Sequence, residues 1–141
     1  MNVKIQISNG QIPTLGTQAS AGYDLHSACD SIVTAKKWAL IPCGFTMEMP
    51  VDWEAQIRPR SGLALNHGIT VLNSPATIDS DYRGEIKVIL YNVSDVDFVI
   101  KRGMRIAQMV FAKLTQANLI PTISIEKNTE RGDKGFGSTG H

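Results

Sequence analysis

The chain has 141 residues, of which 43% are hydrophobic and 19% charged, and its formal net charge is +1. This length suits one domain with its own core. The balanced charge argues against a nucleic-acid partner, because a surface that tracks phosphates would leave a basic excess. No stretch approaches the roughly 18 apolar residues of a membrane span, and the N-terminus lacks the apolar run of a signal peptide. We therefore expect a cytoplasmic protein with no membrane partner.

The two cysteines, Cys29 and Cys43, and the three histidines form no closely spaced cluster of the kind that binds zinc. The acidic residues form no obvious metal cage either. A disulfide between the two cysteines is neither required nor excluded by their spacing.

In the first half of the chain, apolar residues alternate with polar ones at a period of two. The alternating segments are 3–7, 45–49 and 53–57, and turn residues separate such segments throughout the sequence. This period is the signature of β-strands with one buried face. Together with frequent turns, it predicts an all-β fold of the sandwich or barrel kind.

One short helix is expected in residues 59–66, where Leu63-Ala64-Leu65 favours helix and Ser61 is predicted to act as the N-cap. A helix N-terminus presents unpaired N–H groups with partial positive charge, and Arg60 stands beside it. This segment is therefore a candidate phosphate site. Alternatively, it is an ordinary capped turn.

Residues 73–85 gather carboxylates, a phenol, an arginine and a carboxamide just ahead of the next strand. The amide of Asn73 has both a donor and an acceptor and can read a pyrimidine edge. An aspartate near a bound water can act as a general base, and Tyr82 presents a flat face to a sugar. As the alternative, an Asp-rich turn between strands is a common surface feature, with Arg83 in a weak ion pair with Asp81 or Glu85.

Segments 86–91 and 106–111 carry apolar or aromatic residues on both faces. In 106–111, Ile106 and Val110 are expected on the face opposite to Ala107, Met109 and Phe111. A strand buried on both sides in a small barrel suggests that one face packs against another subunit.

The C-terminal stretch 130–140 cannot build a core, because it is dominated by glycine with few apolar side chains. It is well suited to lie over a nucleotide. Glycine lets backbone N–H groups approach phosphate oxygens, Arg131 offers a planar fork for bidentate phosphate binding, and Phe136 can stack on a base. A solvated terminus is the alternative.

Together these segments resemble the five ordered motifs of the trimeric dUTP pyrophosphatases (dUTPases). The matching stretches, in order, are residues 21–25, 58–64, 73–85, 103–109 and 131–140. The resemblance implies an all-β, jelly-roll-like β-barrel that assembles as a homotrimer, with the C-terminal arm exchanged between subunits. It also implies a barrel domain over residues 1–127 and a flexible, glycine-rich lid over residues 128–141.

The same resemblance implies hydrolysis of dUTP to dUMP and pyrophosphate by attack of water on the α-phosphorus. This reaction would lower dUTP and supply dUMP for thymidylate synthesis. Mg²⁺ is the implied cofactor, held by the phosphates of the substrate and by water rather than directly by the protein. Asp24 resembles the acid that lies near the water shell of the metal.

Within the third motif, Asp79 matches the aspartate that orients and deprotonates the attacking water. Tyr82 matches the aromatic that packs under deoxyribose and excludes ribonucleotides. Asn73 matches the residue that reads uracil in a β-hairpin pocket too narrow for the methyl group of thymine.

The remaining motifs match residues that bind phosphate or cover the base. The second motif supplies a phosphate loop from a different subunit, the fourth supplies a glutamine near the phosphates, and the tail supplies the lid, in which Arg131 clamps the γ-phosphate and Phe136 stacks on uracil. The matching residues are Arg60, Ser61, Gly62, Gln108, Arg131, Phe136, Gly137, Ser138 and Thr139.

Three positions depart from the common pattern of the family. Ala76 and Lys134 stand where glycine is usual, and Met104 stands where an acidic residue is frequent. A positive φ at Ala76 would strain the backbone, Lys134 adds a cation to the tail or stiffens it, and Met104 is expected at a surface turn.

Three other functions are compatible with the same fold. A dCTP deaminase would need a pocket for the amino group of cytosine and usually a longer chain, and the compact third motif and glycine-rich terminus argue against it. A binding module would keep the pocket but act on a protein partner, although the sequence has no extra insert. A catalytically inactive trimer would not need Asp79, Arg60 and the tail.

Overall fold

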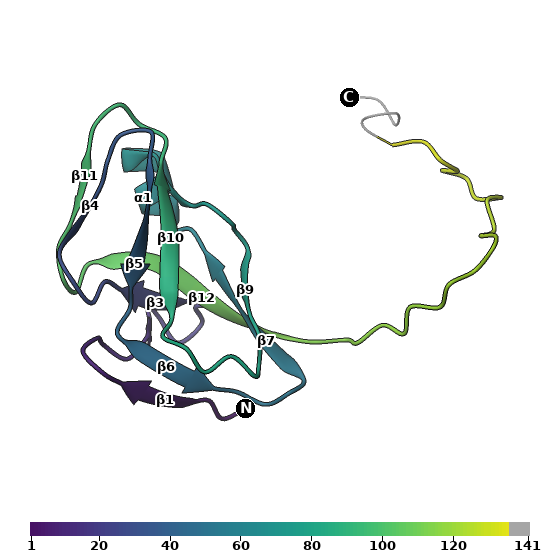
Figure 1. Ribbon diagram of the computed structural model, residues 1–141, viewed down its shortest axis with the longest axis horizontal. Helices are drawn as coiled ribbons and strands as arrows, with labels where there is room; N and C mark the ends of the chain where they lie inside the picture. The colour runs from purple at the N-terminus through teal and green to yellow at the C-terminus, as the bar shows by residue number, and fades with distance from the viewer. Residues whose placement is uncertain (136–141) are drawn as a thin grey trace.

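The protein is built almost entirely of short β-strands (Figure 1), as seen in a computed structural model that describes residues 1–135. The elements in chain order are β1 (Lys4–Ile7), β2 (Thr14–Leu15), β3 (Tyr23–His26), β4 (Ser31–Val33), β5 (Trp38–Pro42), β6 (Phe45–Glu48), β7 (Trp53–Arg58), α1 (Ser61–His67), β8 (Ile69–Val71), β9 (Ala76–Ile78), β10 (Lys87–Asn92), β11 (Phe98–Ile100) and β12 (Arg105–Lys113). The all-β prediction is confirmed. The strands predicted at 3–7, 45–49, 53–57, 86–91 and 106–111 correspond to β1, β6, β7, β10 and β12.

The strands form four sheets, and every pairing within residues 1–135 is antiparallel. The largest sheet has the order β2-β3-β12-β7-β9, a second has the order β5-β10-β8, and two ribbons pair β1 with β6 and β11 with β4. Most neighbours are far apart in the sequence. The sheets therefore wrap around one core instead of forming a simple meander.

β12 is the longest strand, with nine residues, and it pairs with β3 on one side and β7 on the other. Its register with β3 shifts between Arg105 and Ala107. Both Ile106 and Ala107 are buried, as expected for a strand with two apolar faces. The register shift locally interrupts the two-residue period of the strand.

β10 has one face in the core and one face that the single chain covers only in part. Val88 and Leu90 are buried, whereas Ile89 and Tyr91 on the other face are half-buried. Their partners across β5 are Leu40 and Trp38, and both of these side chains are exposed. The prediction of two apolar faces on this strand is confirmed.

α1 has seven residues and begins at Ser61, so the prediction that Ser61 is the N-cap is wrong. Arg60 holds the N-cap position with extended dihedral angles, φ −91° and ψ 130°, and its side chain makes no capping hydrogen bond. The helix ends at Gly68, which adopts φ 64° and donates its N–H to the carbonyl of Ala64. No helix within residues 1–135 is long and apolar enough to cross a membrane.

The chain leaves the barrel after Lys113, and residues 114–135 contain neither helix nor strand. Figure 1 shows this segment, in green to yellow, extending away from the body of the molecule. Its apolar side chains are exposed, namely Leu119, Ile120, Ile123 and Ile125. The boundary between the barrel domain (residues 1–127) and the lid (residues 128–141) stays a prediction.

Candidate active site

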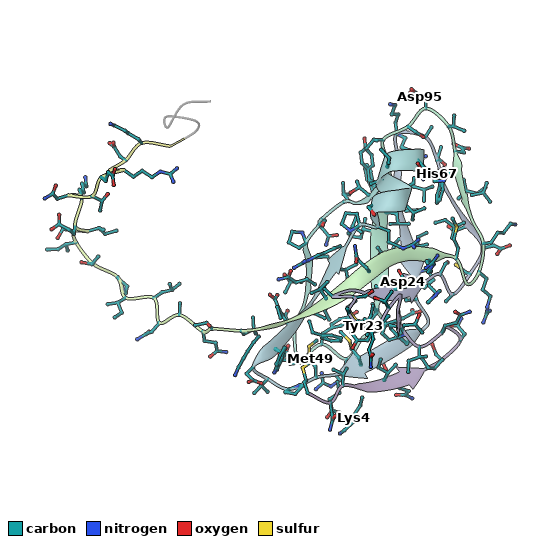
Figure 2. All side chains as sticks on the ribbon, turned by 180° about the vertical axis from the view of Figure 1, so that it is seen from behind. Lys4, Tyr23, Asp24, Met49, His67 and Asp95 are labelled. Carbon is teal, nitrogen blue, oxygen red and sulfur yellow. The ribbon has the colours of Figure 1, made fainter. Side chains whose placement is uncertain are left out.

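A polar cavity of about 400 Å³ lies where β3, β12 and the start of α1 meet. Its lining residues come from the first, second and fourth of the five motifs and from the loop that precedes the first. They are Gly16, Ser20, Ala21, Gly22, Asp24, Arg60, Ser61, Gly62, Arg105 and Gln108. Figure 2 shows Asp24 within the barrel, close to β12 and remote from the extended tail.

The strand register explains why these residues meet. Gln108 in the middle of β12 is paired with Asp24 on β3 and with Arg58 on β7. β7 then leads directly into Arg60 and Ser61 at the start of α1. Residues as far apart in the sequence as Asp24 and Arg105, 81 positions, are thereby brought to one site.

Asp24, Arg60 and Arg105 form a closed ring of polar contacts at the cavity. The Nε of Arg60 lies 3.0 Å from Oδ1 of Asp24, and Nη1 of Arg105 lies 3.1 Å from Oδ2 of Asp24. Nη1 of Arg60 donates to the backbone carbonyl of Arg105 at 3.2 Å. Since one carboxylate faces two guanidinium groups, the ring carries a net positive charge suited to an anion.

Gln108 is fixed from two sides. Its Nε2 donates to the carbonyl of Pro59 at 2.8 Å. A Cβ atom added at Gly22 would lie only 3.1 Å from Cδ and 3.2 Å from Cβ of Gln108. Glycine at position 22 therefore allows the first motif to approach the fourth, and a side chain there would displace Gln108.

His26 stands beside the ring, and sequence reasoning did not single it out. Burial lowers the pKa of its imidazole, and Arg105 and Arg60 lower it further, against the opposing effect of Asp24. Its buried Nδ1 has no hydrogen-bond partner within residues 1–135. Both the burial and the two arginines favour the neutral form of the imidazole.

The predicted residues of the third motif do not line this cavity. Asp79 directly follows Ile78, which is paired with Ala55 on β7. Arg60 is the fifth residue beyond Ala55, which corresponds to roughly 16 Å of extended chain. Within one chain, Asp79 therefore lies well away from Arg60.

Tyr82 is held in place by its own loop. Its N–H donates to the carbonyl of Asp79 at 3.2 Å, and its hydroxyl donates to the carbonyl of Glu85 at 3.1 Å. The ring packs on Gly84, where an added Cβ would lie 2.5 Å from Cζ of Tyr82. Since Tyr82 is 45% exposed, part of the ring remains open to a ligand.

The strands around Asn73 do not pair with each other. β8, which precedes Asn73, pairs with β10, and β9, which follows it, pairs with β7. Asn73 therefore lies in the loop that joins β8 to β9, and its role in a uracil pocket stays a prediction. Arg83 also differs from its predicted surface ion pair, because its Nη1 donates to the carbonyl groups of Ser80 and Tyr82 at 2.7 and 3.0 Å.

The three departures from the family pattern each have a structural outcome. Ala76 lies in β9 and is buried, and it is not among the residues with positive φ, so its methyl group causes no backbone strain. Met104 closes the Lys101–Met104 turn, and its partly buried side chain packs against the core. Lys134 accepts a hydrogen bond at its carbonyl from Nε of Arg131, at 2.9 Å.

The tail residue Arg131 lies in a local turn and lines no part of the cavity. Gly132 donates to Oγ1 of Thr129 at 2.9 Å and has a φ of 58°. The other predicted lid residues, Phe136, Gly137, Ser138 and Thr139, lie outside the described residues.

Asp24 is the acidic side chain among the residues that line the polar cavity. The described part of the chain has no group of three histidine, cysteine or acidic side chains that would form a metal cage. Both carboxylate oxygens of Asp24 already contact arginines. This carboxylate can still reach a metal through water, in line with the strong preference of Mg²⁺ for keeping its own water ligands.

A second cavity, of about 460 Å³, is mainly apolar and contains none of the predicted site residues. It lies between the N-terminal segment and β12, and its lining includes Val3, Ile5, Tyr23 and Phe111. The chemistry of the polar cavity, not the larger size of this one, makes the polar cavity the candidate active site.

The chain is similar to known proteins over nearly its full length. The dUTPase family model matches residues 8–140. The chain is 52% identical over 143 residues to the deoxyuridine 5'-triphosphate nucleotidohydrolase of Rhizobium etli (strain CIAT 652), with 96% of this chain and 91% of that protein covered. The chain belongs to the dUTPase family. It is also 53% identical over 139 residues to the family member of the same name from Rickettsia rickettsii (strain Sheila Smith), covering 97% of this chain and 93% of that protein.

Solved dUTPases share the fold. A mutant dUTPase of Staphylococcus bacteriophage 80alpha with dUpNHpp superimposes with a TM-score of 0.91 at 22% identity, covering 99% of both chains. A mutant dUTPase from phage phi11 of S. aureus, described with a structural Mg(II) ion, gives a TM-score of 0.81 at 17% identity, covering 89% of this chain and 99% of that one. The all-β, jelly-roll-like fold expected for a dUTPase is confirmed.

Five of the residues that the sequence assigned to the active site line the polar cavity, namely Asp24, Arg60, Ser61, Gly62 and Gln108. It missed Arg105, although this residue belongs to the fourth motif. Neither the bulge next to Arg105 nor the ion pair of Arg105 with Asp24 can be recognised from the neighbouring residues in the sequence. The charge and the nearness of Arg105 to Gln108 in the sequence were the available hints.

Proposed function

We propose that the protein hydrolyses dUTP to dUMP and pyrophosphate. The observation that carries this proposal is the polar cavity, in which residues of three dUTPase motifs meet in a chain that belongs to the dUTPase family. A structurally similar phage dUTPase with dUpNHpp supports a ligand of this kind. The family relatives named deoxyuridine 5'-triphosphate nucleotidohydrolase support the reaction.

The cavity binds the triphosphate in this proposal. Arg60 supplies N–H groups for charge-assisted hydrogen bonds, Ser61 a hydroxyl, and Gln108 an amide. Gly62 leaves open space beside its backbone, because an added Cβ would meet no atom within 4 Å. When bound, Mg²⁺ would add positive charge at the triphosphate, and Asp24 would contact its water shell.

Asp79 orients the attacking water and accepts its proton, and the water attacks the α-phosphorus. A general base of this kind contributes roughly 10²–10⁴-fold to the rate, while positioning and charge neutralisation supply most of the remainder. Tyr82 carries the sugar on its exposed face, and Asn73 reads the base.

The assembly is a homotrimer whose sites are shared between chains. Asp79 and Arg60 lie too far apart in one chain to act on one phosphate, so the base reaches the cavity from a neighbouring subunit. The second, partly covered face of β10 supports close packing of copies, because Trp38 and Leu40 are exposed beside it. Exposed apolar clusters of this kind mark interaction surfaces.

The C-terminal arm closes a site on a neighbouring subunit. Residues 114–135 extend from the barrel and expose several isoleucines, which would gain by covering apolar surface on another copy. Arg131 then reaches the γ-phosphate, Phe136 covers uracil, and Gly137, Ser138 and Thr139 add contacts to the phosphates. Residues 128–141 form the lid.

Pyrophosphate release measured with Mg²⁺ and each of dUTP, dTTP, dCTP and UTP tests the proposal. We expect turnover of dUTP alone, because the site discriminates against both the 5-methyl group and the 2'-hydroxyl. Release of ammonia from dCTP would instead indicate a deaminase. Absence of turnover with all four nucleotides would contradict hydrolysis.

A further inference from the structure

We propose that Arg105 is a positioning residue that sets the orientation of the Arg60 guanidinium toward the triphosphate. The inference rests on the proposed function, since it concerns how the same cavity holds phosphate. No contact between Arg105 and substrate is required. Arg105 acts through Asp24 and through its own backbone carbonyl.

The ring of three residues supplies the geometry. Asp24 holds Nε of Arg60 at 3.0 Å with one oxygen and Nη1 of Arg105 at 3.1 Å with the other. The Arg105 carbonyl receives the Nη1 proton of Arg60 at 3.2 Å. Three elements, β3, β12 and the N-cap of α1, therefore fix one side chain.

The exposed fractions of the three side chains indicate that Arg60 is the residue held in place and Arg105 the residue that supports it. The side chain of Asp24 is 14% exposed and that of Arg60 is 25% exposed, whereas that of Arg105 is 53% exposed. Arg105 lies where the register of β12 with β3 shifts, and bulges are common beside functional sites. Arg105 thus flanks the two more buried groups.

The ring leaves Arg60 partly free. A guanidinium has five N–H donors, and the contacts with Asp24 and the Arg105 carbonyl engage two of its nitrogens. The remaining donors stay available for phosphate in a fork that is already oriented. Because ordering a long side chain costs free energy, a fork fixed before binding favours the transition state.

Arg105 also limits how much of Asp24 is available to Arg60. With Arg105 in place, the second carboxylate oxygen is occupied, so Arg60 contacts only Oδ1. Without it, Asp24 is free to bind the whole fork of Arg60 in bidentate geometry. The fork would then turn away from the phosphates, and turnover would fall although both residues remain present.

A double-mutant cycle tests this inference with dUTP hydrolysis as the readout. The variants are Arg60→Gln, Arg105→Gln and the two combined. We expect Arg105→Gln to lower kcat/KM by roughly 10- to 100-fold, mainly through kcat. The double variant should match Arg60→Gln within about threefold, because residues that act as a unit are non-additive.

Two further variants separate positioning from general structural effects. Lys113→Gln is the matched control, because Lys113 forms an exposed ion pair with Asp52, at 3.9 Å, toward the other end of β12. It should leave kcat/KM unchanged. Arg105→Lys should recover much of the lost kcat, because it restores a cation beside Asp24.

The outcomes distinguish this inference from the proposed function. If wild-type protein hydrolyses dUTP but the two losses multiply in the double variant, Arg105 acts independently of Arg60 and the inference is wrong. An Arg105→Gln variant with wild-type kcat would also overturn it. A wild-type protein that hydrolyses none of the four nucleotides overturns the proposed function and the inference with it.

Discussion

Replacing Gly84 with alanine should displace the ring of Tyr82 while leaving the barrel folded. The added Cβ would lie 2.5 Å from Cζ and 2.9 Å from Cε2 of Tyr82. Since non-bonded carbon atoms pack at about 3.5 Å or more, the ring must move by roughly 1 Å. Position 84 has no positive φ, so the substitution acts through this contact and not through backbone strain.

The expected effect on stability is small. A displaced ring loses the 3.1 Å hydrogen bond from the Tyr82 hydroxyl to the Glu85 carbonyl, which contributes about 0.5–1.5 kcal/mol. For a chain of this length the corresponding decrease in Tm is about 2–6 °C. The effect on selectivity should be larger, because a displacement near 1 Å can reduce turnover by up to about 100-fold.

The assay compares kcat/KM for dUTP and UTP in wild type, Gly84→Ala and Tyr82→Phe. We expect Gly84→Ala to reduce the preference for dUTP at least about tenfold. Tyr82→Phe is the matched control, because it removes the same hydrogen bond but keeps the ring on Gly84. It should show the lower Tm with nearly unchanged preference. Full discrimination by Gly84→Ala, or equal loss in both variants, would refute the role assigned to the ring.

Three further predictions concern the tail, the cysteines and the imidazole beside the site. Deleting residues 131–141 should leave the Tm of the barrel nearly unchanged while strongly reducing dUTP turnover, because the hydrogen bonds of the Arg131 side chain and the Gly132 N–H stay within the tail. A chain that fails to fold would show the tail to be structural. In the native protein a thiol reagent should label Cys29 but not Cys43, since burial, with a smaller contribution from Glu85, raises the pKa of Cys43 to about 12; rapid labelling of both would contradict the packed core around Cys43. The pKa of His26 in the folded protein lies below its ordinary value of 6.5. As the pH decreases, the imidazole is therefore protonated in the unfolded chain before it is protonated in the folded protein, so the free energy of unfolding falls as the pH decreases below 6.5. His26→Gln should flatten that part of the Tm–pH profile, and an unchanged profile would contradict the assignment.

The strands that carry a clear two-residue period could be predicted from the sequence. In β6, Phe45 and Met47 are buried between less buried neighbours, so the pattern and the fold agree. The short strands β2, β4 and β11 have only two or three residues each. Such segments are too short to show a period, and pairing with distant partners defines them.

Features that depend on distant pairing could not be predicted. The register of β12 with β3 shifts between Arg105 and Ala107, and nothing within the segment signals this shift. The N-cap also depends on backbone geometry, because Arg60 adopts the extended conformation that places Ser61 inside the helix. The ring of Arg60, Asp24 and Arg105 follows from register and was therefore missed.

In the proposed trimer, each active site combines Asp79 of one chain with Arg60 of another. Two inactive variants, Asp79→Asn and Arg60→Gln, test it when they are unfolded together in equal amounts and refolded. Each variant alone should show turnover reduced by orders of magnitude. When subunits combine freely, every trimer that contains both variants has one site at which an intact Asp79 meets an intact Arg60.

Pyrophosphate release from dUTP by the co-refolded mixture is therefore the decisive measurement. We expect recovery of activity to about a quarter of the wild-type value, because each half of a shared site is intact in half of the subunits. Wild-type protein taken through the same refolding provides the reference. A mixture no more active than the two variants refolded separately would show that Asp79 and Arg60 act within one chain, and it would contradict the shared site.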